Sequence, residues 1–381
     1  MVYLDHNATT PLDPTARDAM FEHLGKEFGN PSSIHSSGRK ARAVVDDARD
    51  RLAALIGAKS HEIVFTGGGT ESCNLGLMGI ARAHDVRGKH IIISAIEHHA
   101  VLHAAEHLKH FEGFEISLLP VDSSGVVDPY VLADLIRADT TVVSIMHANN
   151  ETGVIQPLEA LSGICSEKGV FFHTDAVQTF GKLPVRTDLP GLSSLSIAGH
   201  KFYGPKGVGA LWIKAGIAIS RTAHGGSHEN SRRPGTENVA AIAGMAAAAE
   251  VTCSRVDSES TCLVPLRERL WQKISSTCPT SIRNGDPSRT LSNTLNVSFP
   301  GADGEALLMG LDLEGVCVSS GSACMVGSIQ PSHVLLAMGV PSETALATVR
   351  FSLGHSTTES DIDIAAGAVA RVTKLQHGLA A

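Results

Sequence analysis

The sequence contains no Cys-x-x-Cys pair, and its seven cysteines are an odd number spread over 381 residues. Disulfide frameworks and zinc knuckles need paired, closely spaced cysteines, so this pattern argues against both, and no metal site is expected. Unpaired cysteines are typical of proteins of the reducing cytosol. The seven are Cys73, Cys165, Cys253, Cys262, Cys278, Cys317 and Cys324.

Long apolar runs and an excess of basic charge are also lacking. The N-terminal MVYLDHNATT carries a charge and polar groups where a signal peptide needs an apolar core. No apolar stretch reaches the roughly 18 residues of a membrane span. With 31 Lys and Arg against 39 Asp and Glu, the net charge is -8, which gives no general attraction to nucleic acid or an anionic membrane. We therefore expect a cytoplasmic protein that binds neither.

Aromatic residues are scarce, at 4%, whereas glycine is abundant, with 37 residues. Abundant glycine indicates many turns and close approaches of the backbone. Hydrophobic residues make up 43% of the chain, which is typical of globular proteins, and the length indicates two or three structural units.

Short β-branched runs alternate with helical stretches from about residue 14 to residue 245. This alternation predicts an α/β fold of parallel βαβ units, with helices on both faces of a sheet. Ligands of such sheets gather at the carboxyl ends of the strands. The expected strands are 91–94, 116–119, 141–145, 170–173, 195–197 and 208–213, and the helices between them include 100–110, 129–137 and 158–168.

An alanine-rich stretch, 239–251, continues into a charged helical segment that reaches about residue 276. This pattern predicts one long helix that joins two lobes. Beyond it, a smaller α+β lobe is expected, with strands 295–299 and 348–352 and helices 306–311 and 359–375.

A Gly-Gly-Gly-Thr turn at 67–70 follows the apolar run 63–65 and precedes the helical stretch 74–83. Backbone N–H groups at a helix start, together with a threonine hydroxyl, can hold an anion such as phosphate. A flexible turn between strand and helix fits the same pattern equally well. The turn is not a nucleotide P-loop, because no Gly-Lys-Ser/Thr follows it, and the segment 199–206 has proline where a P-loop has lysine.

Two charged residues follow apolar strands. A carboxylate such as Asp175 is costly at the end of a buried strand unless a positive group meets it, and a cationic ring nitrogen would serve. Lys201 comes at the end of another strand, in a glycine-rich turn. Lysine forms Schiff bases with aldehydes, and a pyridoxal ring needs such a lysine together with an acid at its ring nitrogen. Taken singly, either residue is more often a surface charge.

The segment 318–328 places Cys324 among small polar residues. Small neighbours indicate exposure and mobility rather than packing, which suits a nucleophilic thiolate. The other six cysteines lie mostly in apolar or helical stretches and are expected to be inert packing residues.

Ordered motifs along almost the whole chain carry a resemblance to a known family. They are YLDHNATTP at 3–11, NPSSIH at 30–35, GGGTES at 67–72, EHHAV at 97–101, HANNETG at 147–153, DAVQ at 175–178, GHKFYGPKG at 199–207, RRPGT at 232–236, the cysteine segment and RFSL at 350–353. Together they resemble the pyridoxal-phosphate-dependent cysteine desulfurases of the NifS/IscS group, within the class V aminotransferase superfamily.

The resemblance implies a fold type I pyridoxal-phosphate-dependent transferase. Its large domain would contain a mostly parallel seven-stranded sheet flanked by helices, and its smaller domain would be α+β. The large, cofactor-binding domain would span 15–255. The small domain would comprise 1–14 and 256–381 and carry the catalytic cysteine loop at about 318–330. A homodimer is also implied.

The same resemblance implies the residues that hold the cofactor ring. Lys201 would bind the cofactor covalently, and Asp175 would keep the ring nitrogen protonated. Gln178 would donate a hydrogen bond to the phenolate oxygen, one turn from Asp175 if that segment starts a helix. His98 would stack on the ring and move protons.

For the phosphate, the resemblance implies four residues, one of them from the partner subunit of the dimer. The family usually has serine where this chain has Ala198, so one phosphate hydrogen bond is expected to be missing, worth about 1–2 kcal/mol. The implied phosphate ligands are Gly69, Thr70, His200 and, from the partner, Thr236.

For the substrate, Arg350 would clamp the carboxylate in a bidentate pair. Asn150 would contact both cofactor and substrate, and Asn7 would line the substrate side. L-Cysteine would be converted to L-alanine, with its sulfur transferred to Cys324 as a persulfide. The sulfur would then pass to an acceptor protein for iron–sulfur cluster assembly or another thiolation.

Several alternatives keep the same fold and cofactor: an aminotransferase, a kynureninase-like hydrolase or a selenocysteine lyase. The cysteine segment favours desulfuration, because an aminotransferase does not need Cys324. A non-catalytic sulfur carrier is a different class of protein, and the intact set of site residues argues against it. Met325 and Val326 stand where small hydroxylic residues are frequent after the cysteine. The chain also stops soon after its last helix, so whether a scaffold protein docks there stays open.

Overall fold

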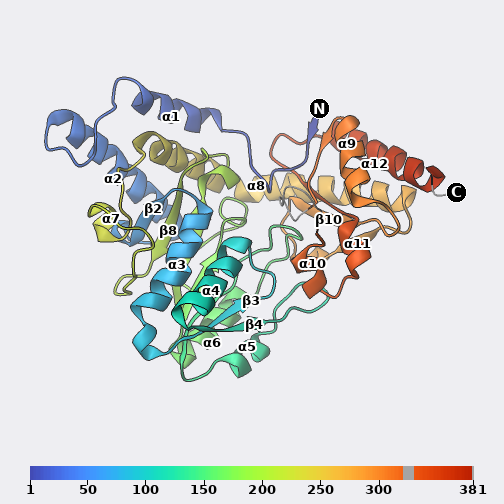
Figure 1. Cartoon of the computed structure of the whole chain (residues 1–381). Helices are drawn as coiled ribbons and strands as arrows, with labels where there is room; N and C mark the ends of the chain where they lie inside the picture. Colours follow the sequence, from blue (N-terminus) through green and yellow to red (C-terminus); the bar gives the residue numbers. More distant parts are fainter. Residues whose placement is uncertain (321–329, 380–381) are drawn as a thin grey trace.

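The computed structural model describes residues 1–320 and 330–379 (Figure 1). Its central sheet has seven strands in the order β2-β8-β7-β6-β5-β3-β4. All neighbouring pairs are parallel except those of β8, which runs antiparallel to both β2 and β7. The mostly parallel seven-stranded sheet is thus confirmed. The strands are β2 (Ile63–Thr66), β3 (His90–Ser94), β4 (Glu115–Leu119), β5 (Thr140–Ser144), β6 (Phe171–Asp175), β7 (Leu192–Ala198) and β8 (Gly209–Ile213).

Helices cover both faces of this sheet. Side chains alternate along a strand, so neighbouring residues enter different cores: Ile92 packs with α2, α5, α6 and α8, whereas Ile91 and Ile93 pack with α3 and α4. The large-lobe helices are α1 (Pro14–Leu24), α2 (Ser36–Ile56), α3 (Gly69–Ala83), α4 (His99–Glu112), α5 (Pro129–Leu135), α6 (Leu158–Lys168), α7 (His228–Ser231) and α8 (Val239–Thr277), with 3-10 turns η1 (Ser60–Glu62), η2 (Asp85–Arg87) and η3 (Gly199–Lys201).

Local sequence signals set the helix ends. Asp128 caps α5 by accepting from the Tyr130 amide, and Pro129 opens that helix. Gly57, Gly113 and Gly169 end α2, α4 and α6 in the left-handed conformation, with φ of 71, 74 and 66 degrees. Such sharp ends return the chain to the next strand and keep the connections short.

The smaller lobe lies beyond α8 (Figure 1). It contains a three-stranded antiparallel sheet, β12-β10-β9, and a parallel pair, β1-β11, and its core also takes in Val2 and Leu4. Its elements are β1 (Val2–Tyr3), β9 (Ile282–Asn284), η4 (Pro287–Arg289), β10 (Thr294–Ser298), α9 (Gly304–Leu313), β11 (Val316–Cys317), α10 (His333–Ala337), α11 (Ser342–Leu346), β12 (Thr348–Ser352) and α12 (Glu359–Leu379).

Helix α8 links the two lobes. Residues 241–249 pack in the core of the large sheet, whereas Leu263, Leu270 and Ile274 pack in the core of the smaller lobe. The helix is long and apolar enough to cross a membrane by length and composition, contrary to the sequence expectation, but 61% of the apolar window is buried within the protein. Its apolar surface is therefore explained by core packing. The domain boundary expected near residue 255 stays a prediction.

Candidate active site

A cavity of about 300 Å³ lies at the carboxyl ends of the central strands. All the site residues expected from the sequence line it except Cys324 and Thr236. Cys324 lies outside the described residues, and Thr236 is exposed. The residues that line the cavity are Asn7, Ala8, Gly69, Thr70, His98, His99, Met146, Ala148, Asn150, Glu151, Asp175, Val177, Gln178, Ala198, His200, Lys201, His333 and Arg350.

Lys201 ends η3, directly after β7. Its Nζ donates to the backbone oxygens of Asn7, at 2.6 Å, and Ala8, at 2.9 Å. Burial, and then the charge of Arg350, lowers the pKa of Lys201 to about 8, although Asp175 and Asp5 oppose the shift. A far larger fraction of this side chain than of an exposed lysine is thus a free amine near neutral pH, and only the free amine attacks an aldehyde.

Asp175 ends β6 and is 6% exposed. Its Oδ1 accepts from the Val177 amide at 2.8 Å, and among the described residues no cation lies within ion-pair distance of this carboxylate. A buried carboxylate without a cationic partner is costly, and a protonated ring nitrogen of pyridoxal phosphate supplies such a partner. Asp175 therefore fits the cofactor that the sequence implies.

The start of α3 forms a cradle. Its N-cap, Gly68, has φ of 152 degrees and provides no side-chain capping bond, so within the described residues no side chain caps the first turn. A Cβ on Gly69 would lie 2.9 Å from Val177 Cγ2 and 3.2 Å from Ala198 Cβ, so glycine lets the helix start approach these two residues closely. A helix N-terminus of this kind binds phosphate well.

His200 lies on the same side of the cavity. Its Nδ1 is 3.2 Å from Thr9 Oγ1. Burial, followed by the charges of Lys201 and Lys206, lowers the pKa of His200 to about 4. The ring is consequently neutral at physiological pH and serves a phosphate group as a hydrogen-bond donor rather than as a charge.

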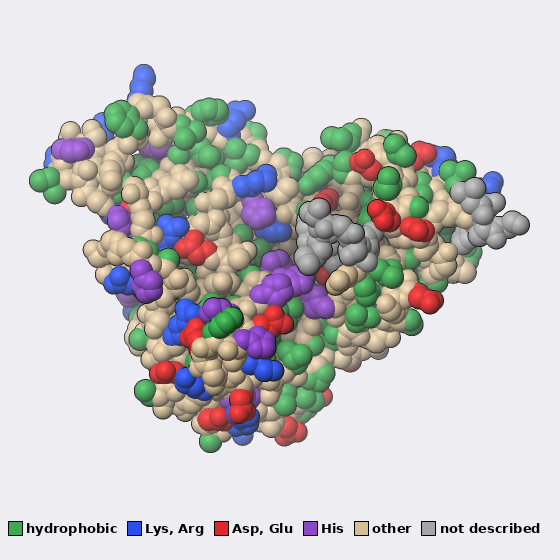
Figure 2. Space-filling model, viewed as in Figure 1, with side chains coloured by type: hydrophobic (Ala, Val, Ile, Leu, Met, Phe, Trp, Pro, Cys, Tyr) green, Lys and Arg blue, Asp and Glu red, His purple; other side chains and the backbone are tan. Residues whose placement is uncertain are grey.

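His98 is the N-cap of α4, where its Nδ1 accepts from the Ala100 amide at 3.1 Å. Burial lowers the pKa of His98, so the ring is neutral and carries its proton on Nε2. His98 also has a ring contact with His99, which in turn contacts His103 and His333. Figure 2 shows histidines gathered at the centre of the face it presents.

Gln178 does not lie on a helix, which corrects the sequence expectation. Residues 177–179 form a turn in which the amides of Thr179 and Phe180 both donate to the Ala176 oxygen. A turn is favoured here because it returns the chain while Asp175 keeps its bond to the Val177 amide. Gln178 nevertheless lines the cavity, and its Nε2 donates to the Asn7 oxygen at 3.0 Å.

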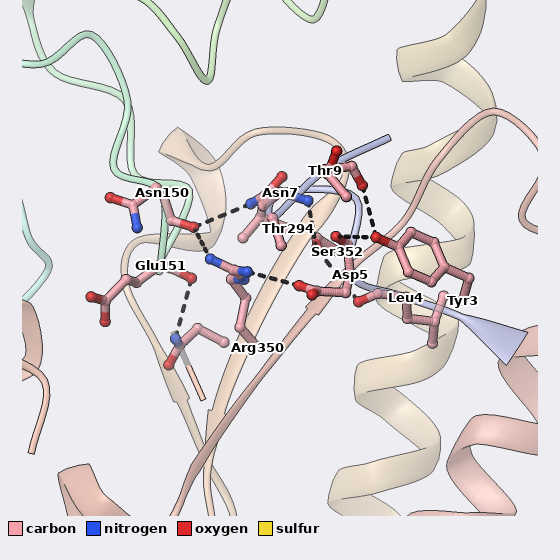
Figure 3. Close-up of polar contacts among 12 residues, drawn as sticks. Tyr3, Leu4, Asp5, Asn7, Thr9, Asn150, Glu151, Thr294, Arg350 and Ser352 are labelled. Carbon is pink, nitrogen blue, oxygen red and sulfur yellow. Dashed lines mark hydrogen bonds and ion pairs between the residues drawn. The ribbon is translucent and has the colours of Figure 1, made fainter. Parts of the chain in front are cut away.

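Arg350, on β12, is held from two sides (Figure 3). Its Nη1 donates to the Asn150 oxygen at 2.9 Å, and its Nη2 donates to Asp5 Oδ1 at 2.8 Å. The Nε is buried and has no hydrogen-bond partner in the described part of the chain. The guanidinium is 3% exposed, and its unused donors suit a substrate carboxylate.

Sequence reasoning assigned no role to Asp5 or Glu97, although both lie within the quoted motifs. Glu97 is fully buried, and its Oε1 accepts from Ser94 Oγ and the Met146 amide. Burial raises the pKa of Glu97 to about 8, so this carboxyl is protonated at neutral pH. The positions of Asp5 and Glu97 inside the motifs were the one signal in the sequence, and the residues that they contact became visible only in the fold.

Both described ends of the cysteine segment are attached at the cavity. Ser319 exchanges two backbone hydrogen bonds with Arg350, at 2.6 and 3.3 Å. On the far side, Ser332 donates to Glu151 Oε2 at 2.5 Å, and His333 lines the cavity. Described residues on both sides of 321–329 therefore contact residues that line the cavity.

No group of His, Cys, Asp and Glu side chains within residues 1–320 and 330–379 is arranged to hold a metal ion. The fold and the cavity, with its buried lysine, unpaired aspartate and open helix start, define a pyridoxal-phosphate-dependent enzyme of fold type I. The sequence profile of the class-V aminotransferases matches residues 2–364.

More specific similarities lie within that class. The chain is 50% identical to cysteine desulfurase IscS of Dictyoglomus turgidum, over 97% of this chain and 94% of that protein, and 44% identical to cysteine desulfurase IscS of Methanosarcina thermophila, over 95% and 89%. Among solved structures, a NifS-like protein superimposes with a TM-score of 0.92 at 36% identity, covering 98% of this chain and 99% of that one. The chain belongs to the NifS/IscS family of cysteine desulfurases.

Proposed function

We propose that this enzyme converts L-cysteine to L-alanine and receives the sulfur on Cys324 as a persulfide. The observation that carries the proposal is the attachment of both described ends of the cysteine segment at the cavity. Ser319 is paired with Arg350, the residue proposed to hold the substrate. Cys324 follows Ser319 by five positions, and at no more than about 3.3–3.6 Å per residue the chain tethers Cys324 within about 18 Å of Ser319.

The described side chains bind the substrate, hold the cofactor and transfer protons. Arg350 binds the substrate carboxylate with its free donors, and Asn150 helps to hold it. Asp175 keeps a proton on the ring nitrogen, and Gly69, Thr70 and His200 hold the phosphate. When bound, pyridoxal phosphate supplies an electron sink for the carbon that bears the substrate amino group. His98 and the free amine of Lys201 are placed to take and return protons in the cavity.

Sulfur transfer then follows from the balance of bonds. The Cys324 thiolate attacks the sulfur of L-cysteine, an S–S bond forms and the C–S bond breaks. The electron pair of that bond stays with the carbon, which takes a proton and leaves as L-alanine. Holding the two sulfurs in one cavity replaces a bimolecular encounter by an oriented one.

The test compares Cys324→Ser with Cys317→Ser, a matched cysteine on β11. We expect Cys324→Ser to bind L-cysteine, with a visible spectral change, but to release almost no sulfide with a thiol reductant, while Cys317→Ser stays close to wild type. Sulfide release from Cys324→Ser at the wild-type rate would refute the persulfide role. Parallel assays with L-selenocysteine and cysteine sulfinate separate the activity from its nearest relatives.

Lys201→Ala tests the cofactor attachment. The wild-type protein is expected to be yellow after loading with pyridoxal phosphate, and the variant is expected to lose the visible absorbance band of the bound cofactor. A colourless wild type would contradict the attachment.

We also propose a homodimer. Exposed apolar side chains near the N-terminus support it: Phe21, Phe28 and Ile34 are 64%, 81% and 91% exposed, and exposed apolar surface is typical of an interface. Thr236, also exposed, would then reach the phosphate of the partner. A monomeric, cofactor-loaded enzyme in light scattering would contradict this arrangement, and Thr236→Ala should retain the cofactor less well.

The remaining partner is a sulfur acceptor protein, for iron–sulfur cluster assembly or another thiolation. We further propose a cytosolic location, because the six cysteines in the described residues are all free thiols, as a reducing compartment requires.

A further inference from the structure

A second lysine lies beside the cavity and has no role in the reaction described above. Lys182 Nζ donates to Gln178 Oε1 and to Asn7 Oδ1, each at 3.0 Å. Both amides are buried, at 4% and 1% exposed. Among the described residues no carboxylate lies within ion-pair distance of Lys182, and burial, followed by the positive charges of Lys201 and Arg350, lowers its pKa to about 7.

The chemistry of this contact fixes the orientation of the amides. The ammonium form of Lys182, which prevails below its pKa of about 7, only donates hydrogen bonds and requires an oxygen atom from each partner. If the Gln178 amide turned over, its NH2 group would face the ammonium, donor against donor, and Lys182 would keep only its hydrogen bond to Asn7 Oδ1. The Gln178 oxygen therefore faces Lys182, and its Nε2 donates to the backbone oxygen of Asn7; both Gln178 and Asn7 line the cavity.

Gln178 depends on Lys182 more than Asn7 does. Asn7 Oδ1 also accepts from Asn293 Nδ2 at 2.9 Å, and Asn7 Nδ2 donates to Thr294 Oγ1 at 2.9 Å. For Gln178 Oε1, Lys182 is the one hydrogen-bond donor within the described residues. Removal of Lys182 leaves Asn7 oriented by two neighbours, whereas the amide of Gln178 keeps a single hydrogen bond, from its Nε2 to the Asn7 oxygen.

We infer that Lys182 is a positioning residue that holds the N–H end of Gln178 toward the cavity, where it donates to the phenolate oxygen of the cofactor. The inference rests on the role proposed for Gln178. Lys182 itself touches neither the cofactor nor the substrate in this assignment and acts through the amide alone.

The experiment is a double-mutant cycle of Lys182→Met and Gln178→Leu. Its readout is the pH midpoint of the visible absorbance change of the bound cofactor, which depends on hydrogen bonding to the phenolate oxygen. Gln178→Leu should raise the midpoint. Lys182→Met should raise it by at least about half a pH unit more in the wild-type background than in the Gln178→Leu background, because only the wild type has an amide to misorient.

Two further variants complete the set. Lys182→Arg keeps a group that only donates and should stay within about 0.2 units of wild type, and Lys168→Met, at the exposed end of α6, should do the same. Should Lys182→Met yield no folded protein, Lys182→Gln takes its place, since an amide both donates and accepts and therefore imposes no orientation. The affinity of the cofactor-free protein for pyridoxal phosphate, measured by fluorescence, should show the same coupling.

The outcomes distinguish the role of Lys182 from the role of Gln178. Equal shifts for Lys182→Met in both backgrounds would overturn the inference, because Lys182 would then act by charge alone. No shift for Gln178→Leu would overturn the role of Gln178, and the inference with it. A shift for Lys182→Arg as large as that for Lys182→Met would also overturn it.

Discussion

Replacement of Arg350 should cost the enzyme its recognition of the substrate carboxylate. A bidentate pair with a carboxylate consists of two charge-assisted hydrogen bonds, each worth about 1.5–3 kcal/mol. Arg350→Leu removes both, about 3–6 kcal/mol, which corresponds to a loss of about 10²- to 10⁴-fold in kcat/KM. Arg350→Lys keeps a charge close to Asp5 but loses the planar fork, so we expect about 10- to 10²-fold.

The assay measures sulfide release, with a thiol reductant, from L-cysteine and from L-cysteine methyl ester, which lacks the carboxylate charge. Arg350→Leu should lose less than about tenfold on the ester, because the interaction it removes is absent there. An equal loss on both substrates would refute the reasoning and assign Arg350 to the architecture of the site. Asp5→Asn is the control, since its Oδ1 still accepts from Arg350 Nη2 and the fork stays intact.

Three further predictions concern the cofactor side and the buried acid. Ala198→Ser should restore a phosphate hydrogen bond of about 1–2 kcal/mol and slow cofactor dissociation about 5- to 30-fold, measured by loss of visible absorbance; an unchanged rate would mean that the hydroxyl finds no phosphate. The rate at which cofactor-free protein binds pyridoxal phosphate should rise with pH around a midpoint near 8, the pKa of Lys201. Arg350→Leu should move that midpoint upward, because it removes a positive charge that lowers the pKa of Lys201. The folded protein keeps a proton on Glu97 up to about pH 8, whereas the unfolded chain, in which the pKa of this glutamate is 4.5, releases it. The contribution of Glu97 to stability therefore falls between pH 4.5 and 8. Glu97→Gln removes this pH dependence, so the melting temperature of the variant relative to wild type should increase over that range, whereas a constant difference would contradict a protonated Glu97.

The strands were predictable because each is a short β-branched run bounded by turn residues. Expected strand 348–352 agrees with β12, and expected helix 158–168 agrees with α6. The direction of β8 was not predictable from its run, since parallel and antiparallel strands of a buried sheet have the same composition. The turn at Gln178 was also missed, because the same contact, an aspartate side chain that accepts from the amide two residues on, starts helix α5 at Asp128 but only a turn at Asp175.

The site residues were predictable only as members of motifs. A pattern identifies Lys201 and Arg350 by residue type and position, but their partners come from distant parts of the chain. Asp5 and Arg350 are separated by 345 residues, and Asn7 and Lys182 by 175. No local periodicity carries such information, and the roles of Asp5 and Lys182 therefore required the fold.

The N-terminal segment, with Asp5 and Asn7, makes all of these distant contacts. Its backbone bridges to β12 at Ser352, and its side chains hold Arg350 through Asp5 and accept from Lys182 through Asn7. The oxygen of Asn7 also accepts from Lys201. One short segment thus contacts the lysine of the large lobe and the arginine of the smaller lobe. Because both contacts span most of the chain, the lysine and the arginine reach their places relative to each other only when both lobes have folded around this segment.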